Sequence, residues 1–158
     1  MAGKRRQVRN KQRPSAVVPG HVIGLAGRGD AAVRLPSGQV AFAGGGAPGD
    51  EVVLRNVGKQ GGVLRGTIDK IISPGSSRTE PFCEVAQRCG GCTWQHVTVA
   101  EQRDQKRLLA RRALGELAAT APWLGQLPER AWRRRLRAHL RPVNGQLRPG
   151  FLAARSHD

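Results

Sequence analysis

The 158-residue sequence carries 27 lysine and arginine residues against 11 aspartate and glutamate residues, a formal net charge of +16. With 39% hydrophobic residues, it can form a modest folded core, which excludes a wholly disordered chain. No run approaches the ~18 consecutive apolar residues of a membrane-spanning helix, and so large a positive charge favours a polyanionic partner, nucleic acid above a membrane surface.

The N-terminal segment, residues 1–13, contains six basic residues and no acidic one. We expect a disordered arm that can lie on phosphates, or a solvated tail without that role. No apolar run follows it, as a secretory signal peptide requires, so the sequence predicts a cytoplasmic protein with reduced thiols.

Residues 14–75 have the sequence pattern of a small β-domain. Short runs of Val, Ile, Leu and Ala alternate with glycine-rich turns and predict five strands, at 16–26, 30–35, 38–45, 50–57 and 62–72. The connections are too short for crossover helices. We therefore predict an α+β protein that begins with a small antiparallel OB-like β-barrel, a type that often binds oligonucleotides.

Residues 76–158 are expected to form a second, incomplete unit, reached through a turn-rich linker at 73–81. Thr98 and Glu101 form a capping-box pattern that predicts a helix running to about Ala119. The helix would pack through an apolar stripe of Leu109, Ala113 and Leu117. We interpret the opposite face as RNA-contacting or, alternatively, merely solvated; its cations are Arg103, Arg107 and Arg111.

Further along, Asn144-Gly145 between two extended segments is a strong β-hairpin signal. The first strand alternates apolar residues with cations over 135–141, which predicts one apolar and one cationic face. We expect this cationic region to contact RNA, through Arg133, Arg134, Arg135 and Arg137.

All three cysteines lie in the stretch "CEVAQRCGGC", as Cys83, Cys89 and Cys92. They can be ordinary reduced thiols, three ligands of a zinc site completed by His96, or three ligands of an iron–sulfur cluster completed by a distant cysteine. The spacing alone does not separate iron from zinc.

The segment "PFCEVAQRCGGCTWQHVTVAEQRDQK", residues 81–106, resembles the cluster segment of the bacterial 23S rRNA (uracil-5-)-methyltransferases. "CGGC" is followed in the family register by Gln95, His96, Gln102 and Lys106, with departures at Val99 and Arg103. "AWRRRLRAHL" and "GFLAARSHD" are also similar to family segments, so the resemblance covers nearly the whole chain.

The resemblance implies a TRAM-type barrel at 14–75 and a 4Fe-4S cluster held by Cys83, Cys89 and Cys92, with a fourth cysteine expected beyond Asp158. It also implies methyl transfer from S-adenosylmethionine to a uracil of rRNA. The chain shows neither a glycine-rich cofactor loop nor a spare nucleophilic cysteine, so we expect the front portion of such an enzyme, inactive alone and monomeric. The alternatives are a stand-alone zinc-containing RNA-binding module and a metal-free basic protein.

Overall fold

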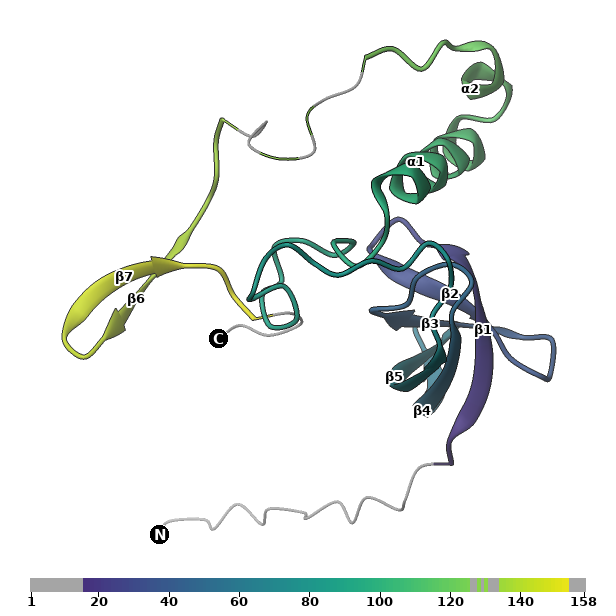
Figure 1. Cartoon of the computed structure of the whole chain (residues 1–158), viewed down its shortest axis with the longest axis horizontal. Coiled ribbons are helices and arrows are strands. Elements are labelled where there is room, and N and C mark those ends of the chain that lie inside the picture. Colours follow the sequence, from purple (N-terminus) through teal and green to yellow (C-terminus); the bar gives the residue numbers. More distant parts are fainter. Residues whose placement is uncertain (1–15, 126–127, 129, 131–133, 154–158) are drawn as a thin grey trace, which may run out of the picture.

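The computed structural model describes residues 16–125, 128, 130 and 134–153. The arm at residues 1–13 lies outside this range. All five strands predicted for the first domain are present (Figure 1). Their bounds are β1 Val18–Leu25, β2 Asp30–Arg34, β3 Val40–Gly44, β4 Glu51–Gln60 and β5 Val63–Ser73.

The five strands form a closed barrel in the order β1-β2-β3-β5-β4, with β4 returning to β1. Four of the five strand pairs are antiparallel. The pair β3–β5 is parallel, with Ala41 opposite Leu64 and Phe42 opposite Arg65. The predicted small OB-like barrel is therefore confirmed; it is antiparallel in four pairs and closed by one parallel pair, between two strands that are not neighbours in the chain.

The barrel interior is filled by small and branched side chains that alternate with outward-facing residues. Val22, Val33, Ala41, Val52 and Leu54 are all fully buried. This period of two is what packing one strand face into a core requires, and it explains why the strands could be recognised in the sequence.

The main helix, α1 (Val99–Leu114), begins after Thr98 as predicted, but the Thr98 side chain makes no capping hydrogen bond. The predicted helix to Ala119 is interrupted at Gly115, whose φ of 59° lies in the left-handed region. A short helix, α2 (Glu116–Thr120), follows it. The expected packing of the apolar stripe was wrong, since Ala113 is exposed and Leu117 is 77% exposed.

A polar residue docks α1 on the barrel instead. Gln105, the one residue of α1 described as buried, accepts a hydrogen bond through Oε1 from the backbone N–H of Leu25, at 2.9 Å. Its Nε2 donates to Glu101 at 2.8 Å. Glu101 therefore serves Gln105 and does not form the predicted capping box. The helix lies above one end of the barrel (Figure 1).

The predicted hairpin is present, as β6 (His139–Val143) paired with β7 (Gln146–Gly150). Asn144 and Gly145 both have positive φ, 52° and 76°, as a tight two-residue turn requires. The regular strand begins at 139 rather than 135, and Leu140 is 64% exposed. The apolar face expected for this strand is thus exposed, and no other element in the part of the chain that the structure describes packs on it.

Among the described residues, no helix is both long and apolar enough to cross a membrane.

Candidate nucleic-acid interface beside the cysteine loop

An ion pair inside the barrel end holds the segment that leads to the cysteines. Asp50 is completely buried and receives hydrogen bonds from the Arg78 guanidinium, with Nη2 2.6 Å from Oδ2. The backbone amides of Ala47 and Gly75 also donate to its carboxylate, at 2.7 and 2.9 Å. The chain after β5 is therefore fixed to the β3–β4 loop.

The same contacts set the ionisation of this carboxyl. Burial raises the pKa of Asp50, but hydrogen bonds from Arg78 and from the backbone amides of Ala47 and Gly75 outweigh that effect and hold the pKa below its ordinary value of 3.8. Asp50 is thus charged wherever the barrel is folded near neutral pH.

The segment that follows the cysteines is paired with this fixed region. Thr98 N–H donates to the carbonyl of Ser77 at 2.8 Å, and Thr79 N–H donates to that of His96 at 3.0 Å. Val97 is 1% exposed and belongs to the barrel core. The two ends of the cysteine segment are therefore both attached to the barrel.

The imidazole ring of His96 faces the barrel. Its Nε2 lies 3.1 Å from the carbonyl oxygen of Gly46. Burial lowers the pKa of His96 below its ordinary value of 6.5, against a smaller opposing effect of that hydrogen bond. This residue, considered above as a zinc ligand, here makes a contact that joins the cysteine segment to the β3–β4 loop.

The lowered pKa of His96 predicts that acid weakens the fold. Because the unfolded chain binds a proton more readily than the folded one below pH 6.5, the free energy of unfolding should fall as the pH drops from 7.5 through 6.5 and below. Urea unfolding at a series of pH values measures this slope. His96→Gln should flatten it, whereas His139→Gln, at an exposed position on β6, should leave it unchanged. Equal slopes in wild type and His96→Gln would show that His96 is not the source of this pH dependence.

The cysteine loop is built from tight turns. Ala86 N–H donates to the carbonyl of Cys83 at 3.0 Å, and Cys89 N–H donates to that of Val85 at 2.8 Å. The Gly91 amide lies 3.3 Å from Cys89 Sγ and donates to it. Cys83 and Cys89 are partly exposed and Cys92 is exposed. Among the residues described, no three of His, Cys, Asp and Glu come together as a group that could hold a metal ion.

The chain returns to this loop after the hairpin. Gly90 N–H donates to the carbonyl of Leu152 at 3.0 Å, and Cys89 forms an isolated antiparallel bridge with Ala153. Figure 1 shows this return beside the cysteine loop. Two segments about 60 residues apart in the sequence thus meet at the cysteines.

A groove of about 1370 Å³ runs between the β1–β2 turn, the cysteine loop, α1 and residues 123–125, 128 and 130. Cys92 lies in its wall. Five cations line it against a single acidic residue among the described lining, Glu80; the cations are Arg28, Arg103, Lys106, Arg107 and Arg130. The groove therefore has a strongly positive lining.

Aromatic rings are interleaved with these cations. The Arg107 guanidinium lies 5.7 Å from the centroid of Trp123, and that of Arg130 lies 4.2 Å from the centroid of Phe82. Both rings are at least half exposed. The groove also contains Gln95, whose Oε1 is buried without a hydrogen-bond partner among the described residues. Cations, exposed rings and an unused acceptor together suit an unpaired nucleic-acid strand.

The structure distributes the arginines predicted to bind RNA over different surfaces. Arg103 and Arg107 line the groove, whereas Arg111 is exposed on α1 and is not among the lining residues. Another three are exposed in the stretch before β6, namely Arg134, Arg135 and Arg137. Arg133 lies outside the described residues.

Several residues of the site were not identified from the sequence. Arg28 is a lone cation in a glycine turn, and Arg130 stands outside any regular pattern. Asp50 and Arg78 are 28 residues apart and meet only through the barrel. The proline- and glycine-rich stretch before Asp50 could have signalled a loop with a structural carboxylate, but not its partner.

Comparison with known proteins places this architecture in a class. No protein-family model matches the chain. It is 34% identical over 142 residues, 86% of its length, to the 23S rRNA (uracil(1939)-C(5))-methyltransferase RlmD of Halomonas elongata, and 36% identical over 138 residues to that of Pseudomonas fluorescens. An uncharacterized RNA methyltransferase of Bdellovibrio bacteriovorus is 32% identical over 131 residues.

By this similarity the chain, a barrel with an attached cysteine loop, belongs to a family of RNA methyltransferases. More particularly, the chain is homologous to the N-terminal portion of the 23S rRNA uracil-C5 methyltransferases, which confirms the resemblance noted in the sequence. It spans about a third of the length of these relatives, 29% and 30% of the two named first.

Proposed function

We propose that this chain supplies the RNA-binding and iron–sulfur portion of an S-adenosylmethionine-dependent rRNA uracil-C5 methyltransferase that acts in the cytoplasm as a monomer. The observation that carries the proposal is the groove, in which a cysteine of the loop and the cations of α1 line one concave surface. The homology to 23S rRNA methyltransferases supports rRNA as the polyanion.

The groove would bind RNA through two kinds of contact. Arg103, Lys106 and Arg107 follow one another along the first turns of α1 and would neutralise successive phosphates. Trp123 and Phe82, each already held near a guanidinium, offer faces on which unpaired bases can stack. Looped or single-stranded RNA fits such a surface better than an A-form duplex, whose bases are enclosed.

The residues of the cysteine loop fit a 4Fe-4S cluster in the chemistry of their donors, although the three thiols are not gathered into one ligand group among the residues that the structure describes. Cys83, Cys89 and Cys92 would supply three thiolates, and the Gly91 amide already donates to the Cys89 sulfur, a kind of hydrogen bond that tunes the reduction potential of a bound cluster. When bound, the cluster would cross-link the loop and fix its shape. The chain's own residues would hold the RNA at a set position for methyl transfer to C5 of a uracil.

Salt dependence of RNA binding tests the proposal. For a labelled single-stranded oligoribonucleotide, the triple variant Arg103→Ala/Lys106→Ala/Arg107→Ala should reduce the log–log salt slope by about 2, at ~0.7 per phosphate contact, and weaken binding at least about tenfold at low salt. Fluorescence anisotropy at several salt concentrations measures both quantities.

Two further variants accompany the test. Arg34→Ala/Lys59→Ala/Lys70→Ala removes the same charge from exposed barrel positions outside the groove and should change the slope little. Arg134→Ala/Arg135→Ala/Arg137→Ala asks whether the cationic stretch before β6 also faces RNA. If the salt slope falls as much in the barrel triple variant as in the α1 triple variant, the RNA is attracted only by the net charge of the protein. The assignment of RNA binding to the groove is then wrong.

A further inference from the structure

Helix α1 carries three of the cations that line the groove, and two glutamines alternate with them along the same turns. The cations are Arg103, Lys106 and Arg107, and the glutamines are Gln102 and Gln105. The position of the cations over the groove depends on how α1 is attached to the rest of the protein.

Apolar burial does little to fix this helix. The one buried residue of α1 is Gln105, and Leu108 and Leu114 are 41% and 58% exposed. Apolar contacts are non-directional and would allow α1 to rotate or slide, whereas a hydrogen bond depends on distance and angle. Amide hydrogen bonds can therefore set the rotation of the helix as well as its position.

Gln102 attaches the first turn of α1 to the segment that follows the cysteines. Its Nε2 donates to the carbonyls of Trp94 and Val97, at 3.0 and 2.9 Å. Both acceptors are themselves held in place, since Val97 belongs to the barrel core and Trp94 Nε1 donates to the carbonyl of Gly29 at 3.2 Å. Gln102 thus ties the start of α1 to a fixed part of the molecule.

Gln105 attaches the next turn of α1 to the barrel, through the 2.9 Å hydrogen bond from the Leu25 N–H. The fit is close at this point, because a side-chain carbon on Gly24 would lie 3.2 Å from Gln105 Oε1. The Nε2 of Gln105 is occupied by Glu101. Both polar atoms of this buried amide are therefore used within the protein.

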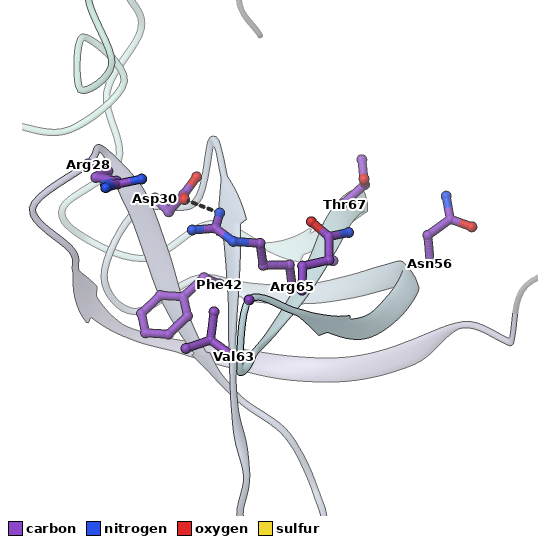
Figure 2. Close-up of a pocket in the computed structure, with 10 residues that line it drawn as sticks. Arg28, Asp30, Phe42, Asn56, Val63, Arg65 and Thr67 are labelled. Carbon is purple, nitrogen blue, oxygen red and sulfur yellow. Dashed lines mark hydrogen bonds and ion pairs between the residues drawn. The ribbon is translucent and has the colours of Figure 1, made fainter.

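The end of the barrel that receives Gln105 is firmly held. Leu25 is 2% exposed, and the turn after it is closed by a 2.7 Å hydrogen bond from the Ala26 N–H to the Asp30 carbonyl. The Asp30 carboxylate is in turn paired with Arg65 at 2.7 Å (Figure 2). An anchor on Leu25 therefore joins α1 to the body of the barrel.

From these contacts we propose that Gln102 and Gln105 are positioning residues for RNA binding, which hold α1 so that its three groove cations meet successive phosphates together. The inference rests on the proposed RNA-binding function and assigns to it two residues that carry no charge. A helix that is already held loses little freedom when RNA binds, so its cations contribute in full to the affinity. The two glutamines act through those cations and not by touching RNA.

The first experiment replaces both glutamines with methionine, which keeps the side-chain length and the net charge. For the labelled single-stranded oligoribonucleotide, Gln102→Met/Gln105→Met should weaken binding about tenfold and lower the log–log salt slope by about 1, because α1 no longer brings every cation to a phosphate. No charge is removed, so a lower slope reports displaced cations. Gln39→Met, the same change at an exposed position outside the groove, should leave both quantities unchanged.

The same double substitution in the α1 triple variant tests whether the glutamines act through the cations. It should cause no further loss of affinity there, since the cations that it displaces are already absent. An equal loss in the wild-type and triple-variant backgrounds would show a general effect on the fold and overturn the positioning role.

A reciprocal exchange provides a rescue. Gln105→Glu places two carboxylates at the 2.8 Å contact with Glu101 and should weaken binding about tenfold. Adding Glu101→Gln restores the net charge and the hydrogen bond, because the carboxylate at position 105 can accept from both the Leu25 N–H and the new amide. Binding should then return to within about twofold of wild type.

Circular dichroism and urea unfolding identify the variants that fold. Wild-type affinity and slope in folded Gln102→Met/Gln105→Met, with the α1 triple variant weakened, overturns the positioning role and leaves the proposed function standing. Wild-type affinity in both variants overturns the proposed function as well. If the methionine variant does not fold, the exchange decides: a folded Glu101→Gln/Gln105→Glu protein that binds no better than Gln105→Glu overturns the positioning role.

Discussion

Asp50→Ala is expected to lower the free energy of unfolding by about 3–5 kcal/mol. The carboxylate is fully buried, and its loss leaves the Arg78 guanidinium, 20% exposed, without its partner. The amides of Ala47 and Gly75 lose their acceptor at the same time. Since small domains have only about 5–15 kcal/mol of stability, the barrel should be partly unfolded at room temperature. Urea titration followed by circular dichroism measures the change.

The control is Asp69→Ala, which removes the same side chain from an exposed pair with Arg55 at 3.4 Å. Exposed ion pairs contribute little, so a change within about 0.5 kcal/mol is expected. Equal losses in the two variants would show that the buried pair is not a special source of stability.

Acid should reproduce the Asp50 effect in the wild type. A carboxyl whose folded pKa is depressed stabilises the fold above its unfolded value of 3.8, and that contribution is lost as the pH falls through the folded pKa. The steep loss should therefore lie below pH 3.8. Asp50→Asn should lack it.

Anaerobic reconstitution with ferrous iron and sulfide is expected to give a brown, oxygen-sensitive species that depends on the three cysteines. Thiolates are the ligands that iron–sulfur clusters require, and the chain has none besides Cys83, Cys89 and Cys92. Replacing all three with serine should abolish the visible absorption. Iron and sulfide analysis, with an added thiol to fill any open iron position, measures cluster content.

His96→Ala provides the matched comparison between metals. Because His96 Nε2 lies against the Gly46 carbonyl, the cluster hypothesis predicts that this variant retains iron even though its fold is weakened. Stoichiometric zinc that is lost in His96→Ala, with no iron species in either protein, would replace the cluster with a Cys3His zinc site. It would favour the RNA-binding module without catalysis.

The barrel was largely predictable because each strand is a short apolar run closed by glycines. The sequence does not state which strands pair, since alternation identifies the inward face of a strand and not its neighbours. The parallel contact between Ala41 and Leu64 therefore came only from the structure. Similarly, Gly115 stands inside a helical pattern and ended α1, because its backbone can adopt a positive φ that other residues avoid.

The chemistry of the candidate site could be predicted from the sequence, but only some of the residues that form it could. Clustered arginines signalled an anion-binding surface, and two of them, Arg103 and Arg107, line the groove. Arg28 and Trp123 reach the same groove from segments about 95 residues apart, and no local pattern links them. Gln105 was overlooked because a buried glutamine among charged neighbours looks like one more surface residue.

The closure of the barrel has a consequence for how quickly the protein folds. Two strand pairs close the barrel: β1 with β4, as between Val18 and Leu54, and β3 with β5 in parallel. Neither pair joins strands that are neighbours in the chain, so neither can form as a local hairpin. Such non-local pairings place a barrel among the slow two-state folders, in the range of about milliseconds to seconds. During synthesis the barrel cannot close until β5 is complete, and the buried ion pair of Asp50 cannot form until Arg78 has been added to the chain. Until then, strands β1 to β4 expose unpaired edges to neighbouring nascent chains.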